Sequence, residues 1–292
     1  MPVSGHVGSI VVMTTTETAG AGYVLGRTDE EYQRLRAQAM TWEAVTSRVL
    51  DAVGLSPGAR CLDAGCGPGE TMRLMAQRVG PAGRVRGVDV DAWIGEQAVA
   101  RLHAAGHGHC SFVAHDLTSE EAIPGGPFDV VYARLLLLHV DDPVAVLRHL
   151  WAAVAPGGHL VVQEYHMTAT DVQPSLPAMK EWDRVALGAF TLAGRDIRMG
   201  SRLPRLFQDA GLGAPDGTDV GGRLEPLSAA APMIAAVYRS LLPAAVSFGL
   251  TSAEGGQQWL ADFEQEVREG GERTGLWPLL IGAWKRKPGG PA

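Results

Sequence analysis

A glycine-rich turn is the segment of this sequence with the clearest chemical potential. Gly65, Gly67 and Gly69 stand at alternating positions between Asp63 and Glu70. Glycine permits the positive φ angles of a tight turn and lets a ligand approach the backbone. The turn opens into a predicted helix, whose first N–H groups attract electron-rich atoms. The segment therefore predicts a nucleotide-like ligand held at a helix N-terminus.

The spacing of these glycines separates two ligand classes. Dinucleotide-binding turns use G-x-G-x-x-G. Here the third glycine comes one residue early, and Glu70 stands where that fingerprint has glycine or alanine. A carboxylate beside a pyrophosphate is repulsive. A ligand without phosphates is therefore favoured, and a nicotinamide-dependent oxidoreductase remains an alternative.

Three acidic residues follow successive predicted strands at their carboxyl ends, where open α/β sheets bind ligands. Asp63 ends the first strand, Asp89 ends the second, and Asp116 follows the third. Asp89 can accept hydrogen bonds from both ribose hydroxyls, and Asp116 can accept one from an exocyclic amine such as adenine N6. The set fits an adenosine that carries a cationic, amino-acid-like tail.

The elements that position these residues alternate along the first half of the chain. Apolar steps of three and four predict a first helix over 28–53, with Thr28 and Glu31 as its capping pair. Short apolar runs between turn residues then predict strands separated by helices or short crossovers. This order predicts a parallel, doubly wound sheet. The expected strands are 60–63, 84–89, 111–114, 128–132 and 159–164.

The second half of the chain lacks this alternation. Helices are expected over 174–193, 201–211, 229–249 and 252–270, and a strand over 277–284. We predict a leader without fixed structure over 1–20 and a single domain over 21–292. Within that domain lie an N-terminal lid (21–55), a cofactor-binding core (56–165), an acceptor-side helical cover (166–275) and a last strand (276–287).

Several motifs of the core resemble, in order and spacing, those of class I S-adenosylmethionine-dependent methyltransferases. They are Cys61–Glu70, Gly87–Asp89, His115–Leu117, Phe128–Val131 and Ala155–Gly158. The chain most resembles the ubiquinone-methyltransferase-like enzymes of bacterial natural-product pathways, and it is also similar to indole C-methyltransferases. The resemblance implies a Rossmann-like α/β fold. Its seven-stranded sheet has helices on both faces and an antiparallel last strand.

The resemblance also implies which residues hold S-adenosylmethionine. Gly65 and Gly67 would line its methionine moiety, and Asp89 would bind the ribose. The other expected contacts are Val90, Asp116 and Leu117 at the adenine, Ala133 and Arg134 at the methionine amino group, and Gln38 from the lid.

The acceptor side is expected where the fifth strand ends, at Glu164, Tyr165 and His166. Neutral imidazole is available near pH 7, so we predict His166 as a general base, with Glu164 and Tyr165 positioning either it or the acceptor. His139 and His149 are expected to be structural. The sequence offers no cluster of metal ligands, and no metal is predicted.

Composition narrows the function further. The 292 residues carry a net charge of −7, which argues against a dedicated nucleic-acid surface. Three cysteines are too few for a disulfide scaffold and are typical of a reducing compartment, so a cytoplasmic protein is expected. We find no apolar run of about 20 residues and predict no membrane partner. The oligomeric state stays open, with a homodimer among the possibilities.

The function expected is methyl transfer to a small organic acceptor. An electron-rich aromatic natural-product intermediate, indole-like or phenolic, is the expected acceptor. A second alternative is a protein of this fold that binds the cofactor without transferring its methyl group.

Overall fold

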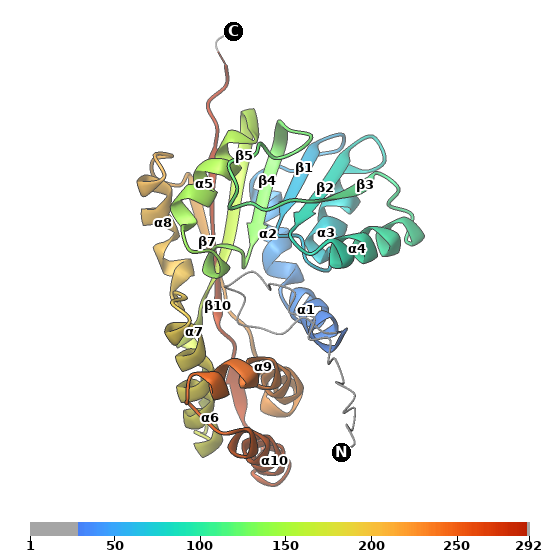
Figure 1. The fold of residues 1–292 in the computed structure, drawn as a ribbon. Helices are drawn as coiled ribbons and strands as arrows, with labels where there is room; N and C mark the ends of the chain where they lie inside the picture. Colours follow the sequence, from blue (N-terminus) through green and yellow to red (C-terminus); the bar gives the residue numbers. More distant parts are fainter. Residues whose placement is uncertain (1–28, 291–292) are drawn as a thin grey trace, which may run out of the picture.

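A seven-stranded sheet, flanked by helices, forms the upper part of the molecule in Figure 1. The computed structural model describes residues 29–290, so the expected leader at 1–20 and the capping residue Thr28 lie outside it. The strand order is β3-β2-β1-β4-β5-β10-β7, and β10 runs antiparallel to both of its neighbours. The Rossmann-like seven-stranded fold is thus confirmed. The strands are β1 (Arg60–Ala64), β2 (Arg84–Asp89), β3 (Cys110–Ala114), β4 (Phe128–Arg134), β5 (Val154–His166), β7 (Gly217–Gly221) and β10 (Leu279–Arg286).

Helices cover both faces of this sheet, because successive strand residues point to opposite sides. In β1, Cys61 joins an apolar cluster with α2 (Glu43–Ala52) and α3 (Glu70–Val79), whereas Leu62 joins a second cluster with α5 (Pro143–Ala152) and α8 (Met199–Asp209). The helix α4 (Ala92–Ala104) lies beside β2 and β3. The core strands are therefore buried on both sides.

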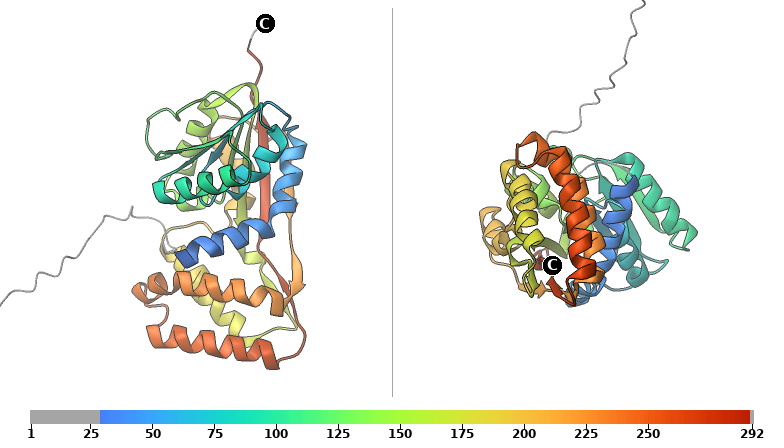
Figure 2. Two further views of the ribbon diagram at one scale, coloured as in Figure 1. Left: turned by 90° about the vertical axis from the view of Figure 1, so that its right-hand side faces the viewer. Right: turned by 90° about the horizontal axis from the view of Figure 1, so that it is seen from below.

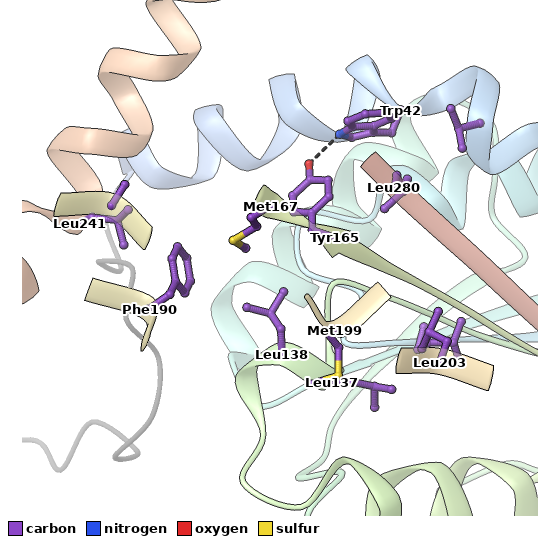
Figure 3. Packing of buried hydrophobic residues seen from close by; sticks show 14 of the residues in the cluster. Trp42, Leu137, Leu138, Tyr165, Met167, Phe190, Met199, Leu203, Leu241 and Leu280 are labelled. Carbon is purple, nitrogen blue, oxygen red and sulfur yellow. Dashed lines mark hydrogen bonds between the residues drawn. The ribbon is translucent and has the colours of Figure 1, made fainter. Parts of the chain in front are cut away.

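The expected first helix is divided in two at Trp42. The helix α1 (Asp29–Thr41) ends there and α2 begins, with Trp42 itself 1% exposed. Its indole N–H donates to the Tyr165 hydroxyl over 2.6 Å (Figure 3), which fixes the corner between the helices. While α2 packs on the sheet, α1 crosses below the end of the sheet and lies against α9 (Figure 2).

The helical cover lies beyond the carboxyl ends of the parallel strands (Figures 1 and 2). Its helices are α6 (Pro177–Trp182), a π-helical turn (Asp183–Leu187), α7 (Gly188–Leu192), α9 (Leu227–Ser247) and α10 (Ala253–Glu269). A second sheet, which the sequence analysis does not predict, closes it in the order β6 (Asp171–Gln173), β9 (Thr274–Leu276) and β8 (Leu224–Pro226). Short 3₁₀ turns occur at Leu137–His139 and Met167–Ala169.

Helix α9 is long and apolar enough to cross a membrane, with a mean hydropathy of 1.4, although the sequence analysis finds no such run. In this fold α9 packs against α10, where Tyr238 and Trp259 stack with ring centroids 4.0 Å apart. Its half-buried Met233, Ile234 and Val237 line a cavity. The apolar side chains of α9 thus pack against α10 and line the cavity within the cover.

Candidate active site

A cavity of about 330 Å³ opens between the carboxyl end of the sheet and the helical cover. One end is formed by the glycine turn and its neighbouring acids, and the other end by apolar side chains of the cover. Met167, Leu138 and Phe190 point toward a common space at this second end (Figure 3). Helix α1 forms a wall along both ends.

The glycine turn is held to the next strand by a carboxylate. Gly65 and Gly67 have φ values of 69° and 45°, which side chains rarely adopt. The N–H of Gly67 donates to Asp89 over 2.9 Å, and the N–H of Asp91 donates to the other Asp89 oxygen over 3.0 Å. Burial raises the pKa of Asp89, and these two donors oppose the rise. Each oxygen retains a second lone pair for a ligand hydroxyl.

Asp63 supplies a second carboxylate at this end of the cavity. The residue is 2% exposed, and its Oδ2 has no hydrogen-bond partner among the described residues. Burial raises its pKa to about 7, with Arg134 opposing the rise. A buried carboxylate with an unused oxygen is suited to a cationic group.

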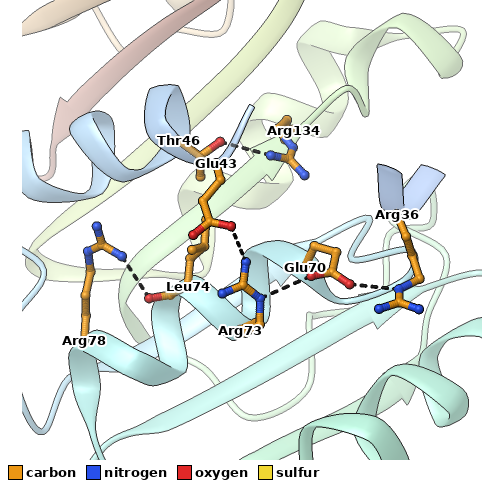
Figure 4. A network of polar contacts seen from close by, with 8 residues as sticks. All are labelled: Arg36, Glu43, Thr46, Glu70, Arg73, Leu74, Arg78 and Arg134. Atoms are coloured by element: carbon orange, nitrogen blue, oxygen red, sulfur yellow. Dashed lines mark hydrogen bonds and ion pairs between the residues drawn. The ribbon is translucent and has the colours of Figure 1, made fainter. Parts of the chain in front are cut away.

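Glu70 also faces the cavity, but its charge is already paired (Figure 4). Its carboxylate lies 3.0 Å from Arg36 and 3.2 Å from Arg73, which also pairs with Glu43. Repulsion between Glu70 and a pyrophosphate is therefore weaker than the sequence argument assumes. The network instead fastens α1 and α2 to the start of α3.

Polar side chains meet at the junction between the two ends. The Tyr165 hydroxyl receives the Trp42 indole N–H and, over 2.7 Å, the Gln38 amide N–H. Arg134 donates to Thr46 over 3.0 Å and also lines the cavity. Any molecule that spans the cavity passes these groups.

The structure brings many of the expected site residues together and leaves others apart. Those that line the cavity are Gln38, Gly65, Gly67, Asp89, Val90, Arg134 and Tyr165. Those outside the lining are Asp116, Leu117, Ala133, Glu164 and His166.

Each position outside the lining has a local cause. Asp116 is exposed, and its Oδ1 accepts the N–H and O–H of Thr118 over 2.8 and 2.7 Å. Leu117 is buried and its carbonyl contacts a ring nitrogen of His149. Ala133 is fully buried in the sheet.

The structure contradicts the geometry needed for a His166 base. Alternation along β5 turns Tyr165 toward Trp42 and His166 toward α8 on the opposite face. There its ring nitrogens contact the hydroxyls of Ser201 and Thr168 at 3.1 and 2.9 Å. The imidazole is outside the cavity and cannot take a proton from a molecule bound in it.

Glu164 stabilises the cavity wall, although its own side chain does not line the cavity. It is fully buried, and its Oε1 accepts the N–H of Leu137 over 2.6 Å, while its Oε2 has no partner among the described residues. Burial raises its pKa to about 8, and backbone N–H groups of residues 136–138 oppose the rise. Glu164 is therefore a positioning residue for the loop that carries Leu138 and His139.

The polar residues of the lining include Arg34, which is not among the predicted site residues, and His139, which is expected to be structural. Burial, together with Arg195 and Arg34, lowers the pKa of His139 to about 4, so its imidazole is neutral near pH 7. His139 lies in the turn that follows β4, at the same edge of the sheet as Asp63 and Asp89, and this place is the signal that could have identified it. Within residues 32–290, no group of three or more His, Cys, Asp or Glu side chains is placed to hold a metal ion.

Comparison with known proteins identifies the family. The family described as methyltransferase domain matches residues 29–214. The chain belongs to this family. Among solved structures, the YcgJ protein from Bacillus subtilis superposes with a TM-score of 0.53 at 14% identity, covering 84% of this chain and 98% of that one. At that identity the likeness supports the fold alone.

Curated relatives match the same core. Trans-aconitate 2-methyltransferase from Paracidovorax citrulli (strain AAC00-1) is 36% identical over 133 residues, 46% of this chain and 48% of the relative. Nocamycin O-methyltransferase from Saccharothrix syringae is 33% identical over 138 residues, 47% of this chain and 46% of the relative. The chain thus spans about half the length of these relatives.

The residues at the glycine-turn end fit S-adenosylmethionine, the cofactor of this family. The unpaired Oδ2 of Asp63 suits the cationic methionine amino group, and Asp89 suits the ribose hydroxyls. At Gly65, a Cβ would come 3.0 Å from Cδ1 of Leu136, and the φ of 69° would strain any side chain placed there. Val90 and Ile94 offer apolar surface for the adenine ring.

Asp89→Ala should weaken the binding of S-adenosylhomocysteine by about 1.5–3 kcal/mol, because a charged hydrogen-bond acceptor is removed. Isothermal calorimetry measures this loss. Asp262→Ala is the matched control, since this exposed aspartate of α10 lies outside the cavity, and its effect should be small. Equal affinities of wild type and Asp89→Ala would remove Asp89 from the binding site.

Glu164→Gln should make stability less dependent on alkaline pH. The folded-state pKa of Glu164 is about 8, above the ordinary value of 4.5. Its protonated form therefore stabilises the fold fully below about pH 4.5, and this contribution is lost as pH rises through 8. Gln keeps an oxygen for the Leu137 N–H but does not ionise. Thermal unfolding at pH 6 and pH 9 should show a smaller fall in Tm for Glu164→Gln than for wild type. The exposed Glu254→Gln should behave like wild type, and identical falls in all three proteins would contradict the assignment.

Proposed function

We propose that this protein transfers a methyl group from S-adenosylmethionine to a small, largely apolar acceptor with an electron-rich aromatic ring. A phenolic hydroxyl is the favoured methylation site, and an indole-like ring is the alternative acceptor. The observation that carries the proposal is the apolar end of the cavity, which lies directly beyond the cofactor residues.

The lining of that end supports an aromatic acceptor. It is formed mainly by aliphatic and aromatic side chains, among them Trp182, Phe190, Met233 and Trp277. Such a chamber excludes water and holds a flat ring close to the cofactor end. The bound cofactor supplies an intrinsically electrophilic methyl group, so the protein's main task is alignment at about 3–3.5 Å. The nocamycin relative, whose name specifies O-methylation, also supports an oxygen acceptor.

His139 is the candidate that takes the proton from a phenolic hydroxyl. It lines the cavity and is neutral above about pH 4. Its low pKa makes it a weak base, but a phenol becomes strongly acidic as its oxygen gains a methyl group. A weak base is therefore sufficient, and no strongly basic group is required.

The proposal places the protein in the cytoplasm. Cys61, Cys66 and Cys110 are all buried and free, which suits a reducing compartment.

Incubation with methyl-labelled S-adenosylmethionine and a panel of phenols, indoles, aliphatic amines and carboxylic acids tests the function. Label should pass to phenols, or to indoles, and mass spectrometry should locate the methyl group. Turnover confined to aliphatic amines or carboxylic acids would contradict the aromatic acceptor. Tight binding of the cofactor without transfer to any class would favour the alternative of a non-transferring protein.

His139→Ala should lower kcat on the best phenol by about 10²–10⁴, the usual value of general-base assistance. His166→Ala is the matched control, since its imidazole faces α8, and kcat should stay near that of wild type. Because His139 titrates near pH 4, wild-type kcat should show no acid limb from this group between pH 6 and 8. A large loss in His166→Ala, with none in His139→Ala, would restore the base predicted from sequence.

A further inference from the structure

The Tyr165 hydroxyl has an unusual set of neighbours, and the inference drawn from them rests on the proposed function of this cavity. Its oxygen receives two N–H groups, from Trp42 over 2.6 Å and from Gln38 over 2.7 Å. A phenolic oxygen has two lone pairs for accepting and one proton for donating. Both lone pairs are occupied, and only the proton remains.

The direction of both hydrogen bonds is fixed by chemistry. The indole Nε1 of Trp42 can only donate. The amide of Gln38 could in principle be turned round, but its oxygen accepts from Arg34 over 2.6 Å, and a guanidinium can only donate. The Gln38 NH₂ group must therefore face Tyr165. Arg34 therefore determines, through the orientation of the Gln38 amide, that Tyr165 accepts this hydrogen bond.

The remaining proton has no acceptor among the described residues, since Tyr165 donates to none of them. Burial raises the pKa of Tyr165, so the proton is present near neutral pH. An unsatisfied buried O–H is costly. Tyr165 lines the cavity, so a ligand in the cavity can satisfy it.

We propose that the Tyr165 hydroxyl donates a hydrogen bond to an oxygen of the acceptor. The site would then select acceptors that carry a hydrogen-bond-accepting oxygen on an apolar body. A carbonyl, carboxylate or phenolic oxygen provides this chemistry. Arg34 and Arg134 also line the cavity and favour an electron-rich oxygen at the same place. The three residues Arg34, Gln38 and Trp42 are positioning residues for Tyr165.

Two probes of nearly equal shape test this selection. The ketone 2-acetonaphthone has an accepting oxygen, and 2-isopropenylnaphthalene replaces it with a methylene group. Calorimetry in saturating S-adenosylhomocysteine gives the affinity ratio of ketone to alkene. The wild type should prefer the ketone, and Tyr165→Phe should reduce that preference by about 2- to 10-fold, as expected for a net hydrogen bond of about 0.5–1.5 kcal/mol.

A second variant keeps the hydroxyl and redirects its proton. In Gln38→Glu the carboxylate accepts from both Arg34 and Tyr165, so the Tyr165 proton turns away from the cavity. The preference for the neutral ketone should fall as in Tyr165→Phe, although the tyrosine is intact. A structural role of Tyr165 alone would weaken both probes equally and leave the ratio unchanged.

Three outcomes would overturn the proposal. They are an unchanged ratio in Tyr165→Phe, failure of the wild type to bind either probe, and a loss of S-adenosylhomocysteine affinity in Tyr165→Phe that exceeds the change in the ratio. The last would mean that the hydroxyl faces the cofactor. None of these outcomes depends on methyl transfer, so the labelled-cofactor panel still tests the proposed function separately.

Discussion

The fold around the cavity depends on the hydrogen bonds that meet at the Tyr165 hydroxyl. They join the end of β5 to the corner between α1 and α2, where Trp42 is buried. This corner turns α1 away from the sheet and along the cavity, between the glycine turn and α9. The ion pairs of Glu70 with Arg36 and Arg73 fasten the same helix to α3. The wall shared by both ends of the cavity is therefore held by polar contacts of fixed direction.

The sheet and the glycine turn are predictable from sequence because their signals are local. Doubly buried parallel strands leave short apolar runs, and the turn needs glycine at Gly65 and Gly67 to reach positive φ. The binding site is then expected at the carboxyl ends of the strands, because the topology of an open α/β sheet determines that place. By contrast, β6, β8 and β9 have three residues each, too few for an alternation pattern. The antiparallel place of β10 came from family resemblance, since no local pattern encodes it.

The error at His166 has a specific physical origin. Sequence shows where β5 ends but not which of its faces meets the cavity, because both faces of the strand are buried and apolar residues do not alternate with polar ones. A shift of one residue exchanges Tyr165 for His166. The place of His139 at the cavity is hidden for a related reason, because its loop is held by Glu164, a residue distant in sequence. Contacts between segments distant in sequence determine which side chains face the cavity.

Charged side chains of both signs line the cavity. Asp63 and Asp89 place carboxylates beside the glycine turn, and Arg34 and Arg134 line the same cavity, where Arg134 also acts on Asp63. A sulfonium and an ammonium group are attracted to the first pair, and an electron-rich oxygen to the second. Because burial removes the screening effect of water, these preferences act strongly over short distances. The carboxylates thus favour a cationic donor beside the glycine turn, and the apolar walls leave alignment as the remaining requirement for reaction.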